Sequence, residues 1–144
     1  MKLLVLNGPN LNMLGIRKPA IYGRKTLAEI MDELAVFLSG RGVDAEFFQS
    51  NHEGELIDRI HASYGDTDGI IFNPGAFSHY SYALRDAIEA VGIPCVEVHL
   101  SDIHNRERFR AVSVIEPVCI AQVSALGERS YFTGAELLLS KLGV

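Results

Sequence analysis

The sequence contains no tryptophan, and only two of its 144 residues are cysteines. Two cysteines do not indicate a disulfide-stabilised secreted fold. Cys95 and Cys119 both lie in apolar runs, so we interpret each as a small buried hydrophobic side chain that favours a reducing compartment. Long apolar runs are also missing: the first one, LLVLN, ends at Asn7 and is too short for a signal peptide or a membrane span. We therefore expect a cytoplasmic protein without a membrane partner.

Basic residues are outnumbered, because 13 lysines and arginines stand against 18 aspartates and glutamates, which gives a net charge of −5. A nucleic-acid-binding protein usually carries a clustered basic surface, so this balance argues against a nucleic-acid partner. The remaining composition, 48% apolar and 22% charged, is typical of a globular protein. A chain of 144 residues has the size of one domain, and we expect a single domain over residues 1–144.

Motifs that would indicate a cofactor or covalent chemistry are missing as well. The sequence has no G-x-G-x-x-G dinucleotide fingerprint and no G-x-x-x-x-G-K-[ST] phosphate loop. His99 and His104 lack the spacing and companion ligands of a zinc site, and no acidic cluster follows a strand to hold magnesium. None of the four lysines lies within an apolar run, where burial would lower its pKa for imine chemistry. These absences leave cofactor-free acid–base chemistry on a small polar or anionic ligand.

What the sequence does contain is an alternation of short apolar runs with segments of helical period. The runs predict five strands: LLVLN, VDAEFFQS, GIIFN, IPCVEVHL and PVCIAQV. Helices are predicted in residues 26–40, 50–64 and 78–92, shortly after Asp102, and in the C-terminal SYFTGAELLLSKLG. Such alternation indicates parallel strands joined by right-handed crossovers, and continuously apolar strands indicate a sheet covered on both faces. The predicted fold is a flavodoxin-like, three-layer α/β sandwich with a five-stranded parallel sheet.

Local signals place the starts of these helices. Thr26 with Glu29, and Ser50 with Glu53, have the spacing of a capping box, in which the two residues satisfy free backbone N–H groups at a helix start. The third helix is predicted to begin at Ser78. The buried face of the second helix is expected at its apolar positions of helical spacing: Leu56, Ile57, Ile60 and Tyr64.

Polar residues gather where the predicted strands end, and ligands of open parallel sheets bind outside those carboxyl ends. The first strand is followed by a long irregular segment, residues 7–25, and such loops are usually functional and often act as lids. This segment and the loop after the third strand supply Asn10, Arg17, Tyr22, Asn73 and His79. The fourth strand and its continuation supply Glu97, His99, Ser101, Arg106, Arg108 and Arg110. Their convergence at one edge of the sheet predicts a functional site.

Most of these residues also have a purely structural explanation. Asn-Pro-Gly after the third strand is ordinary turn chemistry, and His79 is at home in the first turn of a helix. Glu97 and His99 lie two apart on one face of a strand, so they form either a structural ion pair or a histidine that is oriented for acid catalysis. For Arg106 and Arg108 we favour a solvated helix face over a role in the site.

Four blocks stand out over nearly the whole chain: LNGPNLNMLGIRKPAIYG, NHEGELIDRIH, NPGAFSHYSYALRDA and VEVHLSDIHNRERFR. In their order and spacing they resemble the type II 3-dehydroquinate dehydratases. The resemblance implies a single catalytic domain of flavodoxin-like fold that needs no metal or cofactor. It implies that water is removed from 3-dehydroquinate, through an enolate, to give 3-dehydroshikimate in the shikimate pathway. It also implies a cytoplasmic homododecamer, a tetramer of trimers.

The resemblance also implies roles for individual residues. Tyr22 matches the general base and Arg17 its activator, while His99 matches the general acid and Glu97 the residue that orients it. Asn10 matches a residue that holds a water near the enolate oxygen. The matching substrate-binding residues are Asn73, His79, Asp86, Leu100, Ser101 and Arg110, of which Asp86 reaches into the site of a neighbouring subunit.

A tyrosine base requires a cation close to it. A tyrosine has a pKa of about 10 in short peptides, and lowering it by about three units requires roughly 4 kcal/mol of preferential phenolate stabilisation. A guanidinium beside the phenol supplies part of this free energy, because an opposite charge favours the ionised form. Arg17 lies in the same loop as Tyr22, so this loop is expected to carry both the base and its activator.

Two other functions fit the same fold. A flavodoxin-like module that binds a flavin or a nucleotide would need phosphate-cradling loops, which we do not find. An inactive structural homologue would be expected to have lost the loop residues of the site, whereas Arg17 and Tyr22 are both present.

Overall fold

A five-stranded, all-parallel sheet forms the centre of the protein, in the strand order β2-β1-β3-β4-β5. The computed structural model describes residues 1–16, 18–22 and 24–144, and at residues 21 and 22 it describes the backbone alone. The strands within these ranges are β1 (Lys2–Asn7), β2 (Asp44–Gln49), β3 (Gly69–Asn73), β4 (Cys95–Val98) and β5 (Ala121–Val123).

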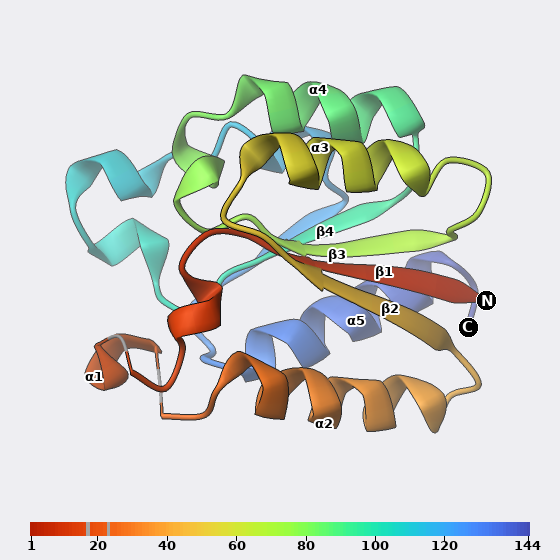
Figure 1. Ribbon diagram of the computed structural model, residues 1–144, viewed down its shortest axis with the longest axis horizontal. Helices are drawn as coiled ribbons and strands as arrows, with labels where there is room; N and C mark the ends of the chain where they lie inside the picture. Colours follow the sequence, from red (N-terminus) through yellow and green to blue (C-terminus); the bar gives the residue numbers. More distant parts are fainter. Residues whose placement is uncertain (17, 23) are drawn as a thin grey trace.

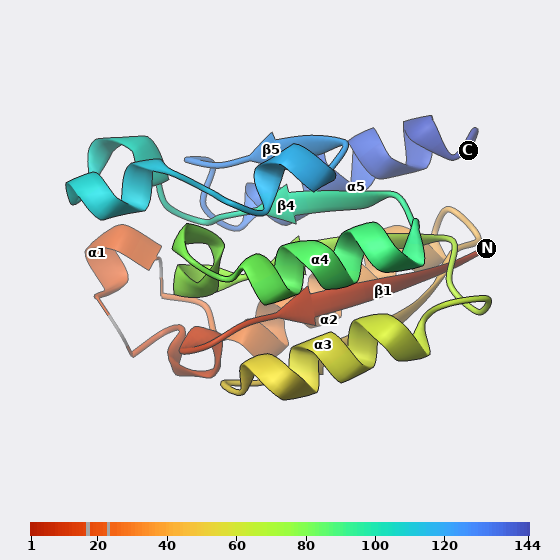
Figure 2. The ribbon, with the colours of Figure 1, turned by 90° about the horizontal axis from the view of Figure 1, so that it is seen from above.

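Helices cover both faces of this sheet. On one face lie α3 (Glu53–Ala62) and α4 (Tyr82–Val91), and on the other lie α2 (Leu27–Ser39) and α5 (Arg129–Lys141), as Figure 1 shows. The one-turn helix α1 (Pro19–Tyr22) lies beyond the carboxyl ends of the strands, at the end of the molecule opposite both termini (Figures 1 and 2). The layers, strand number and strand direction confirm the predicted fold. None of the described helices is long and apolar enough to cross a membrane.

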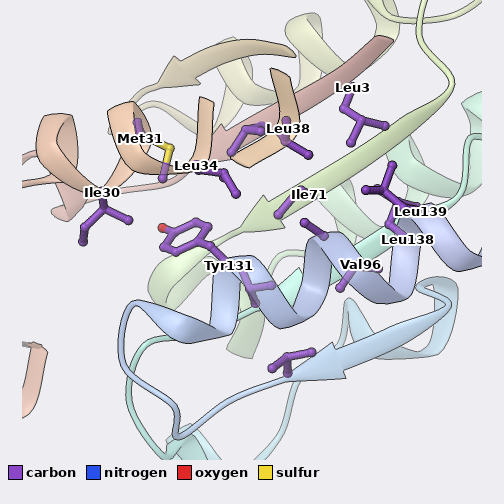
Figure 3. Packing of buried hydrophobic residues seen from close by; sticks show 14 of the residues in the cluster. Leu3, Ile30, Met31, Leu34, Leu38, Ile71, Val96, Tyr131, Leu138 and Leu139 are labelled. Carbon is purple, nitrogen blue, oxygen red and sulfur yellow. The ribbon is translucent and has the colours of Figure 1, made fainter. Parts of the chain in front are cut away.

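Two apolar clusters fill the spaces between the sheet and its helices. In the first, Leu34 and Leu38 of α2 pack with Ile71 of β3 and Tyr131 of α5 (Figure 3). The second cluster joins the other face of the sheet to α3 and α4. Full burial of one such aliphatic side chain contributes roughly 1.5–3 kcal/mol to folding. Packing on both faces therefore holds the inner strands in place. The residues that directly follow these strands are positioned by the same packing.

The edge strand β2 departs from the predicted two-sided burial. Every residue of β3 is buried, whereas Asp44, Glu46 and Phe47 of β2 are exposed. β2 pairs with β1 alone, so its position at the edge explains the exposure. The expectation of a sheet covered on both faces holds for the inner strands.

The predicted helix starts are only partly right. Thr26 caps α2 as predicted, because its side chain accepts a hydrogen bond from the backbone of the first turn. The capping box of Ser50 with Glu53 is wrong. Ser50 instead accepts a hydrogen bond from the N–H of His52 (2.9 Å) and donates one to Glu55 (3.1 Å), so it shapes the loop before α3 rather than its first turn.

Two further predictions at helix ends are also wrong. Tyr64 lies beyond the end of α3 and is 73% exposed, so it does not belong to the buried face. α4 begins after Ser81, whose hydroxyl accepts a hydrogen bond from the N–H of Leu84 (3.1 Å), and not at Ser78. Ser78 is fully buried within a 3₁₀ turn, Gly75–His79, that separates β3 from α4.

Short 3₁₀ turns replace other predicted elements. The segment after β1 is not irregular throughout, because it contains the turn Leu11–Met13 and then α1. The short helix predicted after the fourth strand is the turn Ile103–Asn105. β5 is shorter than its apolar run, since Glu116–Val118 forms another such turn ahead of it.

A close backbone contact joins the loops that follow β1 and β3. The N–H of Gly8 donates to the carbonyl of Asn73 (2.8 Å). A Cβ atom at Gly8 would lie 2.6 Å from the carbonyl oxygen of Pro74, which is closer than real side chains come. Glycine is therefore required at this position for the two loops to meet.

We predict that Gly8→Ala lowers the free energy of unfolding by about 1–3 kcal/mol, because the new methyl group forces the two loops apart. Gly54→Ala is the matched control: its Cβ would meet nothing within 4 Å, and alanine in a helix gains about 0.5 kcal/mol over glycine. Urea denaturation of both variants measures the difference. Equal stability of the two would contradict the close contact.

Candidate active site

The carboxyl ends of β1, β3 and β4 open onto a cavity of about 150 Å³. Three loops line it, one after each of these strands. Its polar lining side chains are those of Asn10, Asn73, His79, His99, Ser101, Arg106 and Arg110. The structure thus brings together residues that are up to 100 positions apart in the chain, as expected from the rule that parallel strands bind ligands at this edge.

Most of the residues singled out in the sequence lie at this cavity. Leu100 also lines it, and Glu97 lies against one of the lining residues, His99. Asp86 is exposed on α4 and does not line the cavity. Arg17 lies outside the described residues, and of Tyr22 only the backbone, at the end of α1, is described.

Glu97 is a fully buried carboxylate with three hydrogen-bond donors. Its Oε2 contacts Nε2 of His99 (2.5 Å) and accepts from Nε2 of Gln122 (2.9 Å), while its Oε1 accepts from Ser113 (2.8 Å). The Ser113 hydroxyl in turn accepts from the N–H groups of Ile115 and Glu116, so its only proton is directed at Glu97. This buried carboxylate is therefore fully paired, as burial requires.

The Glu97 contact fixes the orientation of the His99 imidazole. Because Nε2 contacts the carboxylate, Nδ1 is the ring nitrogen that remains for a ligand in the cavity. His99 itself is only 5% exposed. A histidine whose Nε2 is held by a carboxylate keeps its Nδ1 in one orientation, ready for hydrogen bonding or proton transfer.

His79 reaches the cavity as a neutral side chain. Burial lowers the pKa of His79 below its ordinary value of 6.5, and a hydrogen bond to the carbonyl of Val112 (2.8 Å) offsets this only in part. A carbonyl can only accept, so Nδ1 of His79 carries the proton and Nε2 is a hydrogen-bond acceptor. His79 is therefore suited to bind a hydroxyl group rather than to act as an acid.

Two arginines give the cavity its positive charge. Arg110 pairs with Glu107 through Nε (2.5 Å), and Arg106 donates through Nη1 to the hydroxyl of Ser101 (3.3 Å). Our preference for a solvated face is wrong for Arg106, which lines the cavity, and right for Arg108, which is exposed. The sequence did not distinguish these two arginines: Arg106 lies between the 3₁₀ turns Ile103–Asn105 and Arg108–Ala111, whereas Arg108 begins the second turn.

The Asn73 side chain and two backbone N–H groups add further donors to the cavity. Asn73, fully buried at the end of β3, donates one side-chain N–H to the hydroxyl of Tyr131 (2.9 Å), and its amide oxygen accepts from the N–H of Gly75 (3.2 Å). Among the described residues, the N–H groups of Leu100 and Ser101 have no hydrogen-bond acceptor. Donors without acceptors beside two arginines suit a ligand that carries an anionic group.

Three residues around the site were missed in the sequence. Ser113 lies in a loop with no periodic signal, and Tyr131 lies on a helix of the other layer. Gln122 could have been found, because alignment of the fourth and fifth strands places it beside Glu97 in the β4–β5 register. In the described part of the chain, no group of three or more His, Cys, Asp or Glu side chains could hold a metal ion.

Comparison with known proteins gives a consistent result. The family model described as dehydroquinase class II matches residues 1–139. The 3-dehydroquinate dehydratase of Bacillus pumilus is 52% identical over 140 residues, which cover 97% of this chain and 95% of that protein. The enzyme of the same name from Carboxydothermus hydrogenoformans is 54% identical over 99% of this chain and 92% of its own length. The crystal structure of the type II dehydroquinase from Butyrivibrio crossotus superposes with a TM-score of 0.95 at 45% identity, covering 96% of this chain and 97% of the other.

The lowered pKa of His79 predicts how stability depends on pH. Below about pH 6.5 the unfolded chain binds more protons at this histidine than the folded protein does, so the folded state loses stability as the pH falls. We expect His79→Gln to reduce the loss of unfolding free energy between about pH 7 and about pH 5. Urea denaturation at both pH values measures this, and a loss as large as that of the unmodified protein would contradict the assignment.

Proposed function

This chain belongs to the dehydroquinase class II family, and we propose that it is a 3-dehydroquinate dehydratase of the shikimate pathway. The reaction removes water from 3-dehydroquinate and yields 3-dehydroshikimate. The observation that carries the proposal for this chain's own residues is the fully paired Glu97 that directs Nδ1 of His99 toward the cavity. We further propose that residues 1–144 form one catalytic domain and that it works without a metal or cofactor.

The first proposed step is removal of a proton from C2 of the substrate. This proton is acidic because C2 lies next to a carbonyl group, so its loss gives an enolate. We assign the base to the phenolate of Tyr22, with Arg17 as the cation that favours its ionised form. Support comes from the position of α1, which ends at Tyr22 and lies at the same end of the molecule as the cavity (Figures 1 and 2).

The second proposed step expels the C1 hydroxyl group. The enolate electrons re-form the carbonyl and the C1–C2 double bond, the C1–O bond breaks, and His99 gives its proton to the departing oxygen as water forms. Glu97 stabilises the imidazolium from which this proton comes, and the contact between Nε2 and Oε2 (2.5 Å) supports that role. Asn10, which lines the cavity, is assigned to a water near the enolate oxygen.

The remaining residues are assigned to substrate binding. We propose that the substrate carboxylate accepts hydrogen bonds from Asn73, from the Ser101 hydroxyl, and from the N–H groups of Leu100 and Ser101. This is supported by the absence of acceptors for those two N–H groups among the described residues. His79 and Arg110 are assigned to the ring hydroxyl groups, since the neutral Nε2 of His79 can accept a hydrogen bond from one.

The proposal extends to assembly and location. We propose a homododecamer of four trimers, in which Asp86 contacts the site of a neighbouring subunit. The exposed position of Asp86 on α4, away from its own chain's cavity, supports a role toward a neighbour. Both cysteines are free, which supports a cytoplasmic location.

Purified protein mixed with 3-dehydroquinate is expected to produce the ultraviolet absorbance of a conjugated enone. EDTA should not change the rate, and borohydride added with the substrate should not inactivate the enzyme, because no lysine forms an imine with the substrate. No absorbance change would refute the proposed function. Irreversible inactivation that depends on the substrate would refute the enolate route.

We predict that Tyr22→Phe lowers kcat by about 10²- to 10⁴-fold, since the general base is removed. Binding of a substrate-like acid should change little, because the proposed binding groups lie on the strand ends. The matched control is Tyr64→Phe, which removes the hydroxyl of an exposed tyrosine beyond α3 and should leave kcat unchanged. Near-normal turnover by Tyr22→Phe would overturn the assignment of the base.

A further inference from the structure

A single tyrosine hydroxyl lies deep in the apolar layer between the sheet, α2 and α5. Tyr131 has no exposed surface, and Figure 3 shows its hydroxyl pointing toward Ile30 and Met31 of α2. The hydroxyl donates to Oδ1 of Asn7 (2.5 Å) and accepts from Nδ2 of Asn73 (2.9 Å). It therefore connects the side chains at the ends of β1 and β3, which are neighbours in the sheet register.

These contacts belong to a longer chain of hydrogen bonds with only one possible direction. At one end, the N–H of Gly75 can only donate, and it donates to Oδ1 of Asn73 (3.2 Å). At the other end, the sulfur of Met31 can only accept, and it accepts from Nδ2 of Asn7 (3.4 Å). Each group between them must donate in the same direction. A flipped Asn73 amide would place its oxygen and its nitrogen against the wrong partners at both contacts.

The direction matters because Asn73 lines the cavity. One hydrogen of its Nδ2 goes to Tyr131, and the amide oxygen is occupied by Gly75, so the second Nδ2 hydrogen is what remains for a ligand. At this point the cavity therefore presents a hydrogen-bond donor, the second N–H of the Asn73 amide. A ligand group that only accepts, such as a carboxylate, is favoured there over one that donates.

We infer that Tyr131 is a positioning residue for substrate binding, which acts by fixing the amide of Asn73 with a donor toward the cavity. The inference rests on the proposed function, in which Asn73 binds the substrate carboxylate. Tyr131 itself touches no substrate, because it lies on the far side of Asn73 within the apolar layer.

Packing in the apolar cluster accounts for the ring of Tyr131, and the hydroxyl pairs two buried amides, Asn7 and Asn73. A phenylalanine would leave those amide groups without this partner, so loss of stability and loss of positioning have to be measured separately. Burial raises the pKa of Tyr131 well above that of a free tyrosine, which keeps the proton on the hydroxyl. The hydroxyl consequently stays a donor to Asn7, and the direction of the whole chain stays fixed over the working range of pH.

The inference is tested by steady-state kinetics with 3-dehydroquinate. Tyr131→Phe is expected to raise KM about tenfold, with kcat changed less than about threefold, because a contact made to the substrate in both ground and transition states appears in KM. In an Asn73→Ala background the same substitution should change KM less than about twofold, since the group that Tyr131 positions is already gone. A KM effect of equal size in both backgrounds would overturn the inference.

Two further variants separate positioning from stability. Leu139→Ala removes a buried side chain from the same helix and is expected to lower the melting temperature at least as much as Tyr131→Phe while leaving KM unchanged. Asn7→Leu removes the acceptor that directs the Tyr131 hydroxyl and should raise KM like Tyr131→Phe. If KM follows the melting temperature across the three variants, Tyr131 has a structural role only, and the inference is wrong.

A spectroscopic measurement keeps the test independent of turnover. With ¹⁵N-labelled asparagine, the side-chain N–H groups of Asn73 in the ligand-free protein should exchange with solvent at least about tenfold faster in Tyr131→Phe than in the unmodified protein. The backbone N–H groups of β3 should keep their protection in both. An unchanged exchange rate of the Asn73 side-chain N–H groups would overturn the inference. If the unmodified protein did not turn over 3-dehydroquinate, the proposed function alone would be overturned.

Discussion

The site depends on the pairing of one carboxylate, Glu97, inside the sheet. A buried carboxylate without partners costs several kcal/mol, so the fold must supply donors to it from every side. β5 supplies Gln122, the loop before it supplies Ser113, and the remaining position is taken by His99. The imidazole that faces the cavity is thus oriented by the same contacts that make burial of Glu97 tolerable. Stability and function depend here on one set of hydrogen bonds.

The ends of β1 and β3 show a similar pairing of polar side chains. Asn7 and Asn73 are partners across β1 and β3, just as Glu97 and Gln122 are partners across β4 and β5. Polar side chains at the ends of adjacent strands can therefore hydrogen-bond either to each other or through a shared group, which for the asparagines is Tyr131. The strand ends are polar because they face a site, and they are rigid because the apolar clusters hold the strands behind them.

Features set by residues close together in the sequence could be predicted, whereas features set by residues far apart could not. Periodicity and strand–helix alternation are local signals, and they predicted the five strands, the four long helices and the edge at which the site lies. Predictions failed where an unexpected turn intervened: a 3₁₀ turn moved the start of α4 from Ser78 to Ser81, and Arg106, which lies between two other 3₁₀ turns, lines the cavity. No local pattern indicated that Tyr131 would meet Asn73, 58 positions away.

The proposed chemistry divides between two kinds of scaffold. The proposed acid and the proposed carboxylate-binding groups lie on or directly after strands that are buried on both faces, where positions are preorganised before a ligand arrives. The proposed base, Tyr22, ends α1, whose first residues Pro19 and Ala20 are exposed, as is Lys18 before them. The proposed acid is held by hydrogen bonds inside the sheet, and the proposed base lies on a helix beyond the strand ends (Figure 1). A substitution in α1 can therefore alter one of the two groups without disturbing the hydrogen bonds that orient the other.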